Sequence, residues 1–213
     1  MGIPNLDILI VDDNSPDGTS QIIQALQKTC PNLFLLSRKL KKGLGSAYLD
    51  GFEYAAHREY DMVIQMDGDL SHDISALPNM LELLGEYDLV IGSRYTQGGR
   101  VRNWRWGRIF LSRVSNMFAK LLLGLPFHDL TSGFKVLKMD VIKTIDFSTI
   151  FSQGYVFQIE VVYRAFLKKF HITEYPIVFR GRIKGKSKIS LGIILEAISK
   201  ILVMAFGRLK RQY

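Results

Sequence analysis

Residues 62–72 read MVIQMDGDLSH, a short apolar run that ends in the triplet Asp67-Gly68-Asp69. An apolar run of this length, bounded by turn-forming residues, is typical of a buried strand. In an extended segment residues i and i+2 point to the same side, so both carboxylates can converge on one ion, and Gly68 lets a ligand approach the backbone. Such hard oxygen ligands suit Mg²⁺ or Mn²⁺, with a substrate phosphate completing the shell. The alternative is that these acids only form turns and cap helices.

Similar apolar runs alternate with helical patterns on both sides of this stretch. Strands are expected at 8–11, 33–36, 62–66 and 89–91, and helices at 19–28, 44–59 and 75–84. This alternation is typical of parallel βαβ units, so we expect an α/β fold. Ligands of such sheets bind beyond the carboxyl ends of the strands, which makes the residues after each strand the candidates for function.

The second half of the chain continues the pattern without a linker rich in Pro, Gly or Ser. Helices are expected at 109–123 and 155–168, and strands at 134–137 and 173–179. We therefore expect one domain over residues 1–188. The remaining segment, 189–213, joins the longest apolar stretch to a basic tail. Glu196 and Lys200 would be costly inside a bilayer, so this segment is expected to lie on a membrane surface, with a core-packing helix as the alternative.

The charge of the chain predicts an anionic partner. Lys and Arg number 28 against 20 Asp and Glu, a formal charge of +8. The cations cluster in three loops, 38–42, 94–108 and 180–188. The last loop alternates its cations and contains no acid, which indicates phosphate binding, with a solvated basic face as the alternative. Nucleic acid is disfavoured because no recognition helix, aromatic platform or zinc module accompanies these loops.

A second acidic turn, Asp12-Asp13-Asn14, follows the first expected strand. Part of this turn is expected to cap the next helix, through Asp17 or Thr19. Two adjacent acids exceed what capping needs. A carboxylate at the end of a strand could accept hydrogen bonds from the ribose or base of a nucleotide.

Several catalytic classes are excluded by the absence of their motifs. The glycines near residues 43–45 and 181–187 match neither a dinucleotide fingerprint nor a P-loop, and the chain has no Gly-x-Ser-x-Gly elbow. The sequence thus offers metal ligands and cations without an evident nucleophile or base. This combination suits transfer between two phosphate-bearing substrates, in which the protein mainly positions charges.

Seven collinear segments span nearly the whole chain. They are VDDNSPDGT (11–19), KGLGSAYLDGF (42–52), MDGDLSH (66–72), GSRYTQGGRVRNW (92–104), HDLTSGFK (128–135), GYVFQIE (154–160) and GRIKGKSK (181–188). Together they resemble the polyprenol (dolichol) monophosphate mannose synthases, inverting glycosyltransferases of the GT-A type. The resemblance implies a Rossmann-like, mostly parallel sheet flanked by helices. It also implies metal-dependent transfer of mannose from GDP-mannose to a polyprenyl or dolichyl monophosphate.

Carried over residue by residue, the resemblance implies sets of site residues for each ligand. The donor would be bound by Val11, Asp13, Asp67, Gly68, Asp69, Arg182 and Lys188. The acceptor phosphate would be bound by Arg94, Arg108 and Ser112. Mg²⁺ or Mn²⁺ would be bound by Asp67, Asp69 and Ser71, and the catalytic residues would be Asp67, Asp69 and Arg94.

The sequence departs from the family pattern in two places. Family members begin with a strand and turn of the form Pro-Thr-Tyr-Asn-Glu, where this sequence has MGIPNLD, so a sheet without its first strand is expected. Gly68 stands where Ala is usual, which we expect to be benign. Some members continue into transmembrane helices. For this chain we expect peripheral attachment to the cytoplasmic face of a membrane, with a transmembrane partner subunit as a further candidate.

Two other functions stay open at this point. The same fold could use another nucleotide sugar, such as UDP-glucose. A truncated, non-catalytic subunit that binds lipid phosphate is the alternative from a different class.

Overall fold

The structure, a computed structural model, describes residues 3, 5–40, 43–152, 154–181 and 191–209. Residues Met1–Tyr60 and Asp61–Tyr213 form two compact units.

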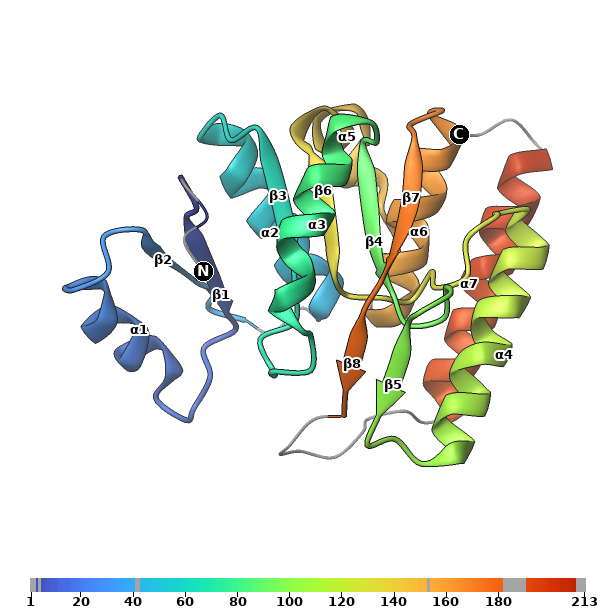
Figure 1. The fold of residues 1–213 in the computed structure, drawn as a ribbon, viewed down its shortest axis with the longest axis horizontal. Coiled ribbons are helices and arrows are strands. Elements are labelled where there is room, and N and C mark those ends of the chain that lie inside the picture. The colour runs from blue at the N-terminus through green and yellow to red at the C-terminus, as the bar shows by residue number, and fades with distance from the viewer. Residues whose placement is uncertain (1–2, 4, 41–42, 153, 182–190, 210–213) are drawn as a thin grey trace. The chain divides into compact units, whose positions relative to one another are not determined.

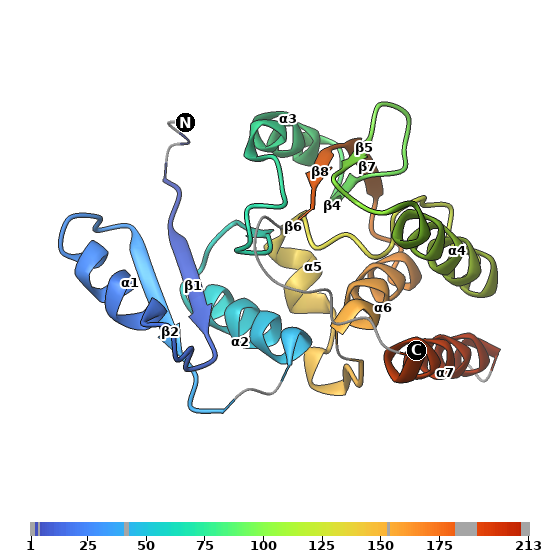
Figure 2. The same cartoon turned by 90° about the horizontal axis from the view of Figure 1, so that it is seen from below.

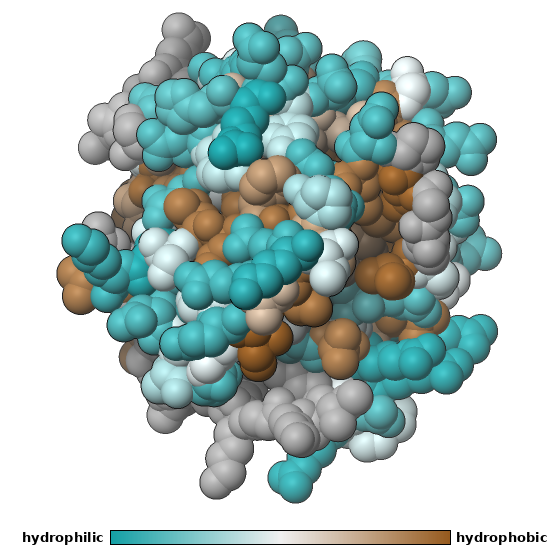
Figure 3. Space-filling view, turned by 90° about the vertical axis from the view of Figure 1, so that its left-hand side faces the viewer, coloured by the Kyte–Doolittle hydropathy of each residue, from teal (hydrophilic) through white to brown (hydrophobic). Residues whose placement is uncertain are grey.

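The first unit is a βαβ arrangement followed by a helix. Strand β1 (Ile8–Asp12) pairs in parallel with β2 (Leu33–Ser37), in a register that runs from Ile8 opposite Leu33 to Asp12 opposite Ser37. Helix α1 (Thr19–Gln27) connects the two strands and α2 (Leu44–His57) follows them (Figure 1). The parallel unit predicted from the alternating apolar runs is confirmed. Apolar side chains also reach the surface, where brown residues interrupt the teal ones in Figure 3.

The second unit contains the main sheet, and one of its strands runs against the others. Its order is β3 (Met62–Gln65), β6 (Lys135–Lys138), β4 (Leu89–Ser93) and β7 (Ile172–Pro176). Strand β6 is antiparallel to both β3 and β4, whereas β4 and β7 are parallel. The sheet is therefore mostly parallel, as expected, with β6 as an exception that the sequence pattern did not predict.

A second, small sheet forms where the expected strand 173–179 divides in two. Ile177 donates its N–H to Ser93 O and accepts from Arg100 N, both at 2.9 Å, so the chain changes partner at this residue. Strand β8 (Val178–Arg180) then pairs in parallel with β5 (Arg100–Arg102). Pro176, which has no N–H to donate, ends β7 just before the change.

Helices cover both faces of the main sheet. Helix α3 (Leu77–Glu82) lies on one face and α6 (Gly154–Leu167) on the other (Figures 1 and 2). Residues 156–165 of α6 are all buried, which explains its nearly continuous apolar sequence. Short 3₁₀ turns flank α3 at Ile74–Ala76 and Leu83–Gly85 and occur again at Phe147–Thr149, and α5 is Met139–Thr144.

Helices α4 (Trp106–Leu123) and α7 (Leu191–Leu209) lie side by side (Figures 1 and 2). Helix α7 also contacts α6, and it buries Ile201 and Met204 while Val203 and Phe206 stay exposed. One face of α7 thus packs into the core and another presents apolar side chains outward. Among the described residues, no helix has the length and apolar character needed to span a membrane. The division of the chain at residue 188 stays a prediction.

The first residue of β6 places a cation in the core. Lys135 is 0% exposed, and its Nζ donates to Gln158 Oε1 at 2.5 Å and to the Ser132 carbonyl. Burial lowers the pKa of Lys135 from 10.5 to about 7, although the charges of Asp129 and Asp67 act in the opposite direction. The core therefore holds a lysine whose charged form is disfavoured by burial, and its polar partners and two nearby carboxylates offset only part of that cost.

Replacing Lys135 by Met tests this arrangement through the pH dependence of stability. Between pH 7 and 10.5 the unfolded chain keeps a proton on Lys135 that the folded protein has released, so this group makes the free energy of unfolding rise with pH. The stability of Lys135→Met relative to the unsubstituted protein should be most favourable at pH 6. It should decline by about 3–5 kcal/mol by pH 10. Urea unfolding at three pH values measures this difference, and a difference independent of pH would contradict the lowered pKa.

Candidate functional site

The acidic triplet follows β3, but strand alternation does not orient its carboxylates. Strand β3 ends at Gln65 and residues 68–70 form a bend, so the extended geometry expected from the sequence is wrong for this segment. Asp67 is instead oriented by its neighbours. A Cβ on Gly133 would lie 2.8 Å from Asp67 Oδ2, and His72 Nε2 lies 3.5 Å from the same oxygen. The close approach of the Asp67 carboxylate requires glycine at position 133.

Asp69 is held by a local turn. Its Oδ1 accepts hydrogen bonds from Ser71 N, at 3.1 Å, and from the Ser71 hydroxyl. Asp73 repeats this arrangement with Ser75, whose N and Oγ lie 3.1 and 2.6 Å from Asp73 Oδ1. The Ser75 hydroxyl lowers the pKa of Asp73, which caps the 3₁₀ turn that starts at Ile74. The two turns therefore have the same local bonding. Ser71 lies beside Asp69, and their binding of a metal ion stays a prediction.

The residues of this segment fit a divalent cation that takes some of its ligands from the protein and the others from a substrate and water. In the part of the chain that the structure describes, no three His, Cys, Asp or Glu side chains are grouped so that they could hold a metal ion. Mg²⁺ used in phosphate chemistry commonly takes only one or two carboxylates and fills its shell with water and substrate oxygens. The Asp67 side chain is 24% exposed, so a cation can reach its carboxylate. The Asp67 carboxylate occupies the space that a Cβ at position 133 would fill.

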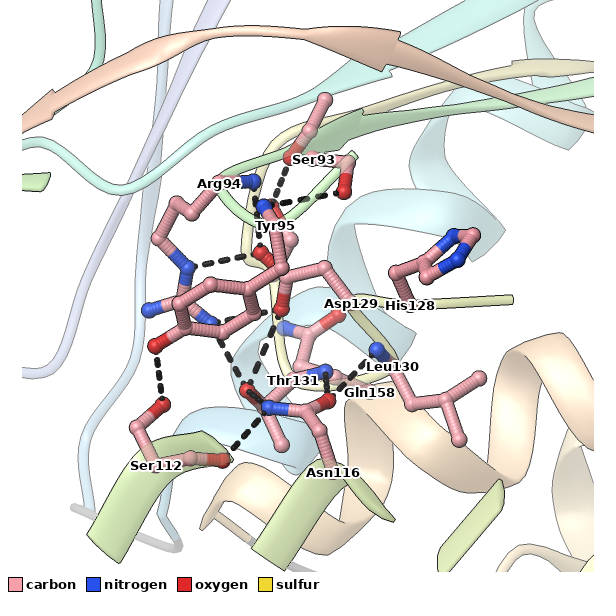
Figure 4. A network of polar contacts seen from close by, with 12 residues as sticks. Ser93, Arg94, Tyr95, Ser112, Asn116, His128, Asp129, Leu130, Thr131 and Gln158 are labelled. Carbon is pink, nitrogen blue, oxygen red and sulfur yellow. Dashed lines mark hydrogen bonds and ion pairs between the residues drawn. The ribbon is translucent and has the colours of Figure 1, made fainter. Parts of the chain in front are cut away.

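Arg94 follows β4 and is fixed by a buried ion pair. Its Nε and Nη2 donate to the two carboxylate oxygens of Asp129, each at 2.7 Å, and Nη2 also donates to Thr131 Oγ1 at 2.7 Å (Figure 4). Burial opposes both charges, but each group offsets this for the other, so the pKa of Arg94 is raised and that of Asp129 is lowered. These bonds do not involve Nη1.

The other two residues predicted to bind the acceptor phosphate lie on α4 and share aromatic neighbours with Arg94. The Arg108 guanidinium lies 3.9 Å from the centre of the Trp104 ring, and that of Arg94 lies 5.5 Å from it. Ser112 Oγ accepts a hydrogen bond from Tyr95 OH at 2.7 Å (Figure 4). The structure therefore brings Arg94, Arg108 and Ser112 into one neighbourhood, and their binding of the acceptor phosphate stays a prediction.

A buried asparagine connects this neighbourhood to the segment before β6. Asn116 of α4 accepts from Leu130 N at 2.7 Å and donates to Ser112 O and Thr131 Oγ1 at 2.9 and 3.1 Å (Figure 4). Sequence reasoning assigned no role to Asn116, Asp129 or Thr131. The signal was present for two of them, because the segment HDLTSGFK contains an acid and a hydroxyl that turn formation does not explain.

The predicted nucleoside ligands belong to the first unit. Val11 lies in β1 opposite Leu36. The Asp13 carboxylate accepts from Arg38 Nη1 at 2.6 Å, and Arg38 is also paired with Asp50 at 2.7 Å. Asp12 organises the turn instead, since it accepts from Ser15 N and Ser20 Oγ, and these bonds lower its pKa.

Two predicted donor ligands, Arg182 and Lys188, lie outside the described residues. Gly68 is exposed, and a Cβ there would meet nothing within 4 Å. This space agrees with the expectation that Ala would be tolerated at position 68.

Helix α4 carries an exposed apolar face, defined here as the apolar stripe. Its residues are Trp106, Phe110, Met117 and Leu121, which are 86%, 70%, 57% and 74% exposed. Their spacing of four, seven and four residues puts them on one side of a helix. A groove of about 390 Å³ beside the stripe is lined by Tyr95, Arg113, Asn116, Met117, Lys120, Leu121 and His128. The stripe is therefore flanked by cations.

Alanine substitutions at Gly133 and Gly68 test whether the position of the Asp67 carboxylate depends on the space at Gly133. Gly133→Ala puts a methyl group 2.8 Å from Asp67 Oδ2, so the carboxylate must move and Mn²⁺ binding should weaken about tenfold or more. Gly68→Ala should leave Mn²⁺ affinity unchanged. Electron paramagnetic resonance of added Mn²⁺ measures both, and thermal unfolding should stay similar because only a side chain moves. Equal Mn²⁺ affinities in the two variants would contradict the role of Gly133.

Comparison with known proteins identifies the family of this chain. The model of the family described as glycosyl transferase family 2 matches residues 2–146. Over 211 residues the chain is 41% identical to a polyprenol monophosphomannose synthase of Mycolicibacterium smegmatis, covering 98% of this chain and 80% of that protein. It is 39% identical over 199 residues to an undecaprenyl-phosphate mannosyltransferase of Micrococcus luteus, covering 93% and 82%.

Solved structures show the same fold at much lower sequence identity. Glucosyl-3-phosphoglycerate synthase from Mycobacterium tuberculosis, in complex with Mn²⁺, UDP and phosphoglyceric acid, matches with a TM-score of 0.66 at 16% identity, covering 93% of this chain and 67% of that one. The same enzyme in complex with phosphoglyceric acid alone matches with a TM-score of 0.64. The predicted GT-A type fold and the predicted resemblance are confirmed, and the chain belongs to glycosyl transferase family 2 and is a glycosyltransferase.

Proposed function

We propose that this protein transfers mannose from GDP-mannose to a polyprenyl monophosphate, with inversion, at a membrane surface. The observation that carries the proposal is the 41% identity, over 98% of the chain, to a polyprenol monophosphomannose synthase. A second relative at 39% identity is named for transfer of mannose to undecaprenyl phosphate. Asp67, Arg94 and Asp129 lie in three of the seven segments that resemble this family.

Asp67 and Asp69, with Ser71, are proposed to hold Mg²⁺ or Mn²⁺ against the donor diphosphate. A protein of the same fold has been crystallised with Mn²⁺ and UDP, which supports the proposal that this protein uses a divalent ion. When bound, the ion would neutralise the charge that develops on the departing nucleotide. Val11, Asp13 and Gly68 are assigned to the donor as well, and so are Arg182 and Lys188.

The acceptor phosphate is assigned to Arg94, Arg108 and Ser112. An oxygen of the lipid phosphate would form the new bond to the anomeric carbon while the bond to the nucleotide diphosphate breaks on the opposite face. This oxygen is already anionic, so the protein need not supply a general base. The rigid pairing of Arg94 with Asp129 prepositions a positive charge and contributes by orientation rather than by proton transfer.

The apolar stripe supports attachment to a membrane surface. Four large apolar side chains project from one side of α4, beside Arg113 and Lys120. An amphipathic helix with flanking cations is suited to an interface with anionic lipid headgroups. Arg108 and Ser112, which would bind the acceptor's phosphate group, lie on the side of the same helix away from the apolar stripe. Attachment on the cytoplasmic face and a transmembrane partner subunit remain parts of the proposal.

The proposed reaction is tested by incubating the protein with GDP-mannose, Mn²⁺ or Mg²⁺ and a polyprenyl phosphate, and measuring mannolipid. Asp69→Ala should reduce transfer by about a hundredfold to a thousandfold, because an electrostatic contribution of this kind is lost from the transition state. Asp73→Ala is the matched control, since Asp73 makes the same bonds to a serine two residues later. It should lose about 1 kcal/mol of stability and retain transfer.

Equal activity of the Asp69 and Asp73 variants would refute the metal assignment. UDP-glucose in the same assay tests the alternative donor, and preference for it would overturn the choice of GDP-mannose. Absence of any glycolipid with either donor and either metal would favour the non-catalytic alternative.

The membrane proposal is tested by sedimentation with vesicles that contain anionic phospholipid. Phe110→Ser combined with Met117→Ser removes two side chains of the apolar stripe that are 70% and 57% exposed. Each large apolar side chain removed from an interface weakens binding by about 1.5–3 kcal/mol, so the bound fraction should fall about tenfold or more. Ile22→Ser, at an apolar residue on α1 that is 58% exposed, should bind vesicles normally. Equal losses in both variants would show that the stripe is not the contact.

A further inference from the structure

His72 is a buried imidazole whose nitrogens have no hydrogen-bond partner in the part of the chain that the structure describes. Its side chain is 1% exposed, and neither Nδ1 nor Nε2 is hydrogen-bonded among the described residues. The ring lies 5.4 Å from the Phe134 ring and 5.2 Å from the Phe179 ring, centre to centre. Buried polar groups are nearly always paired in folded proteins, so two unpaired nitrogens in one ring require an explanation.

The unpaired ring lies beside a residue of the acidic triplet. His72 Nε2 is 3.5 Å from Asp67 Oδ2, at the outer limit of a hydrogen bond and without the geometry of one. The ring has little freedom to move, because aromatic rings contact it and Arg180 N holds the preceding residue through Ser71 O at 2.8 Å. The Asp67 side chain is 24% exposed, whereas the His72 side chain is 1% exposed.

We propose that His72 is a positioning residue for Asp67: its protonated Nε2 already faces Oδ2 in the metal-free protein, and it donates a full hydrogen bond to that oxygen when the carboxylate binds a cation. A donor on Oδ2 fixes the rotation of the carboxylate and directs Oδ1 toward the ion. Outer hydrogen bonds to metal-binding carboxylates commonly set both orientation and affinity. Gly133 acts on the same oxygen by leaving space for it. The inference rests on the proposed function only in taking Asp67 as a cation ligand.

A purely structural role for His72 makes a different prediction. If the ring served only to fill space between Phe134 and Phe179, phenylalanine would serve better, because it has no polar atoms to bury. His72→Phe therefore separates packing from hydrogen bonding. The packing role predicts equal or higher stability and unchanged Mn²⁺ affinity. The positioning role predicts equal or higher stability together with weaker Mn²⁺ binding.

The first experiment reads the proton on His72 without metal or substrate. The chain has four histidines, so a sample labelled with ¹⁵N in the histidine rings gives few imidazole signals, and His72→Phe identifies those of His72. We expect Nε2 to carry the proton, and we expect its signal to shift in Asp67→Asn. A ring protonated on Nδ1 alone, or an Nε2 signal that Asp67→Asn leaves unchanged, would overturn the proposal.

The second experiment measures Mn²⁺ binding by electron paramagnetic resonance, with the metal alone as the probe. His72→Phe should bind Mn²⁺ about tenfold or more weakly, and His57→Phe, on an exposed histidine, should bind normally. His72→Phe combined with Asp67→Asn should be no weaker than Asp67→Asn alone, because the two residues act through one carboxylate. Unchanged affinity in His72→Phe, or additive losses in the double variant, would overturn the proposal.

The two proposals fail in distinguishable ways. A protein whose Mn²⁺ binding by Asp67 depends on His72, but which makes no mannolipid, would refute the proposed function and leave this inference standing. Mannolipid synthesis by a protein whose His72 carries its proton on Nδ1 alone would do the reverse.

Discussion

The course of β6 against the other strands of its sheet is the constraint on which the rest of the site depends. In a fully parallel sheet the segment before a strand lies at the edge opposite to the carboxyl ends. Because β6 is antiparallel, its first residue, Lys135, pairs with Gln65 near the end of β3 and with Ile91 in β4. The segment 129–134 is thereby brought to the edge where those strands end. It supplies Gly133 to Asp67 and Asp129 to Arg94.

This edge holds a set of charges whose burial is tolerable only because they are arranged together. Asp129 and Lys135 are fully buried, and Arg94 is nearly so. A single buried ion would cost several kcal/mol, whereas a bidentate pair with further hydrogen bonds offsets most of that cost. Arg94 and Asp129 form such a pair, and Lys135 has neutral oxygen partners. Loss of Asp129 would leave Arg94 and Lys135 without their main counter-charge. Asp129 therefore stabilises the site, although it is not proposed to bind a substrate or a metal ion.

The sequence predicted the parts of the fold that depend on local pattern. The strands at 8–11, 33–36 and 89–91 and the helices after them are confirmed to within a few residues, because apolar periodicity is a local property. The reversal of β6 was not predictable in this way, since strand direction depends on partners far away in sequence. The same limit explains Asp129, whose role depends on Arg94, 35 residues before it. The bend at residues 68–70 was not predicted either. The apolar residues before the acidic triplet suggested that the extended backbone continues through it.

The turns at Asp69 and Asp73 show why the local geometry of a carboxylate is not enough to predict whether it binds a metal ion. Each carboxylate accepts bonds from the backbone and hydroxyl of a serine two residues later, yet only Asp69 is proposed to bind a metal. The difference comes from what lies next to each turn. Asp73 begins a 3₁₀ turn, whereas Asp69 follows Asp67, whose carboxylate contacts Gly133 and lies near His72. A cation held mainly by two such carboxylates still needs oxygens from elsewhere. In the proposed function the donor diphosphate provides them, so metal and donor would bind together, while the acceptor phosphate would meet the preformed Arg94 site independently of the metal.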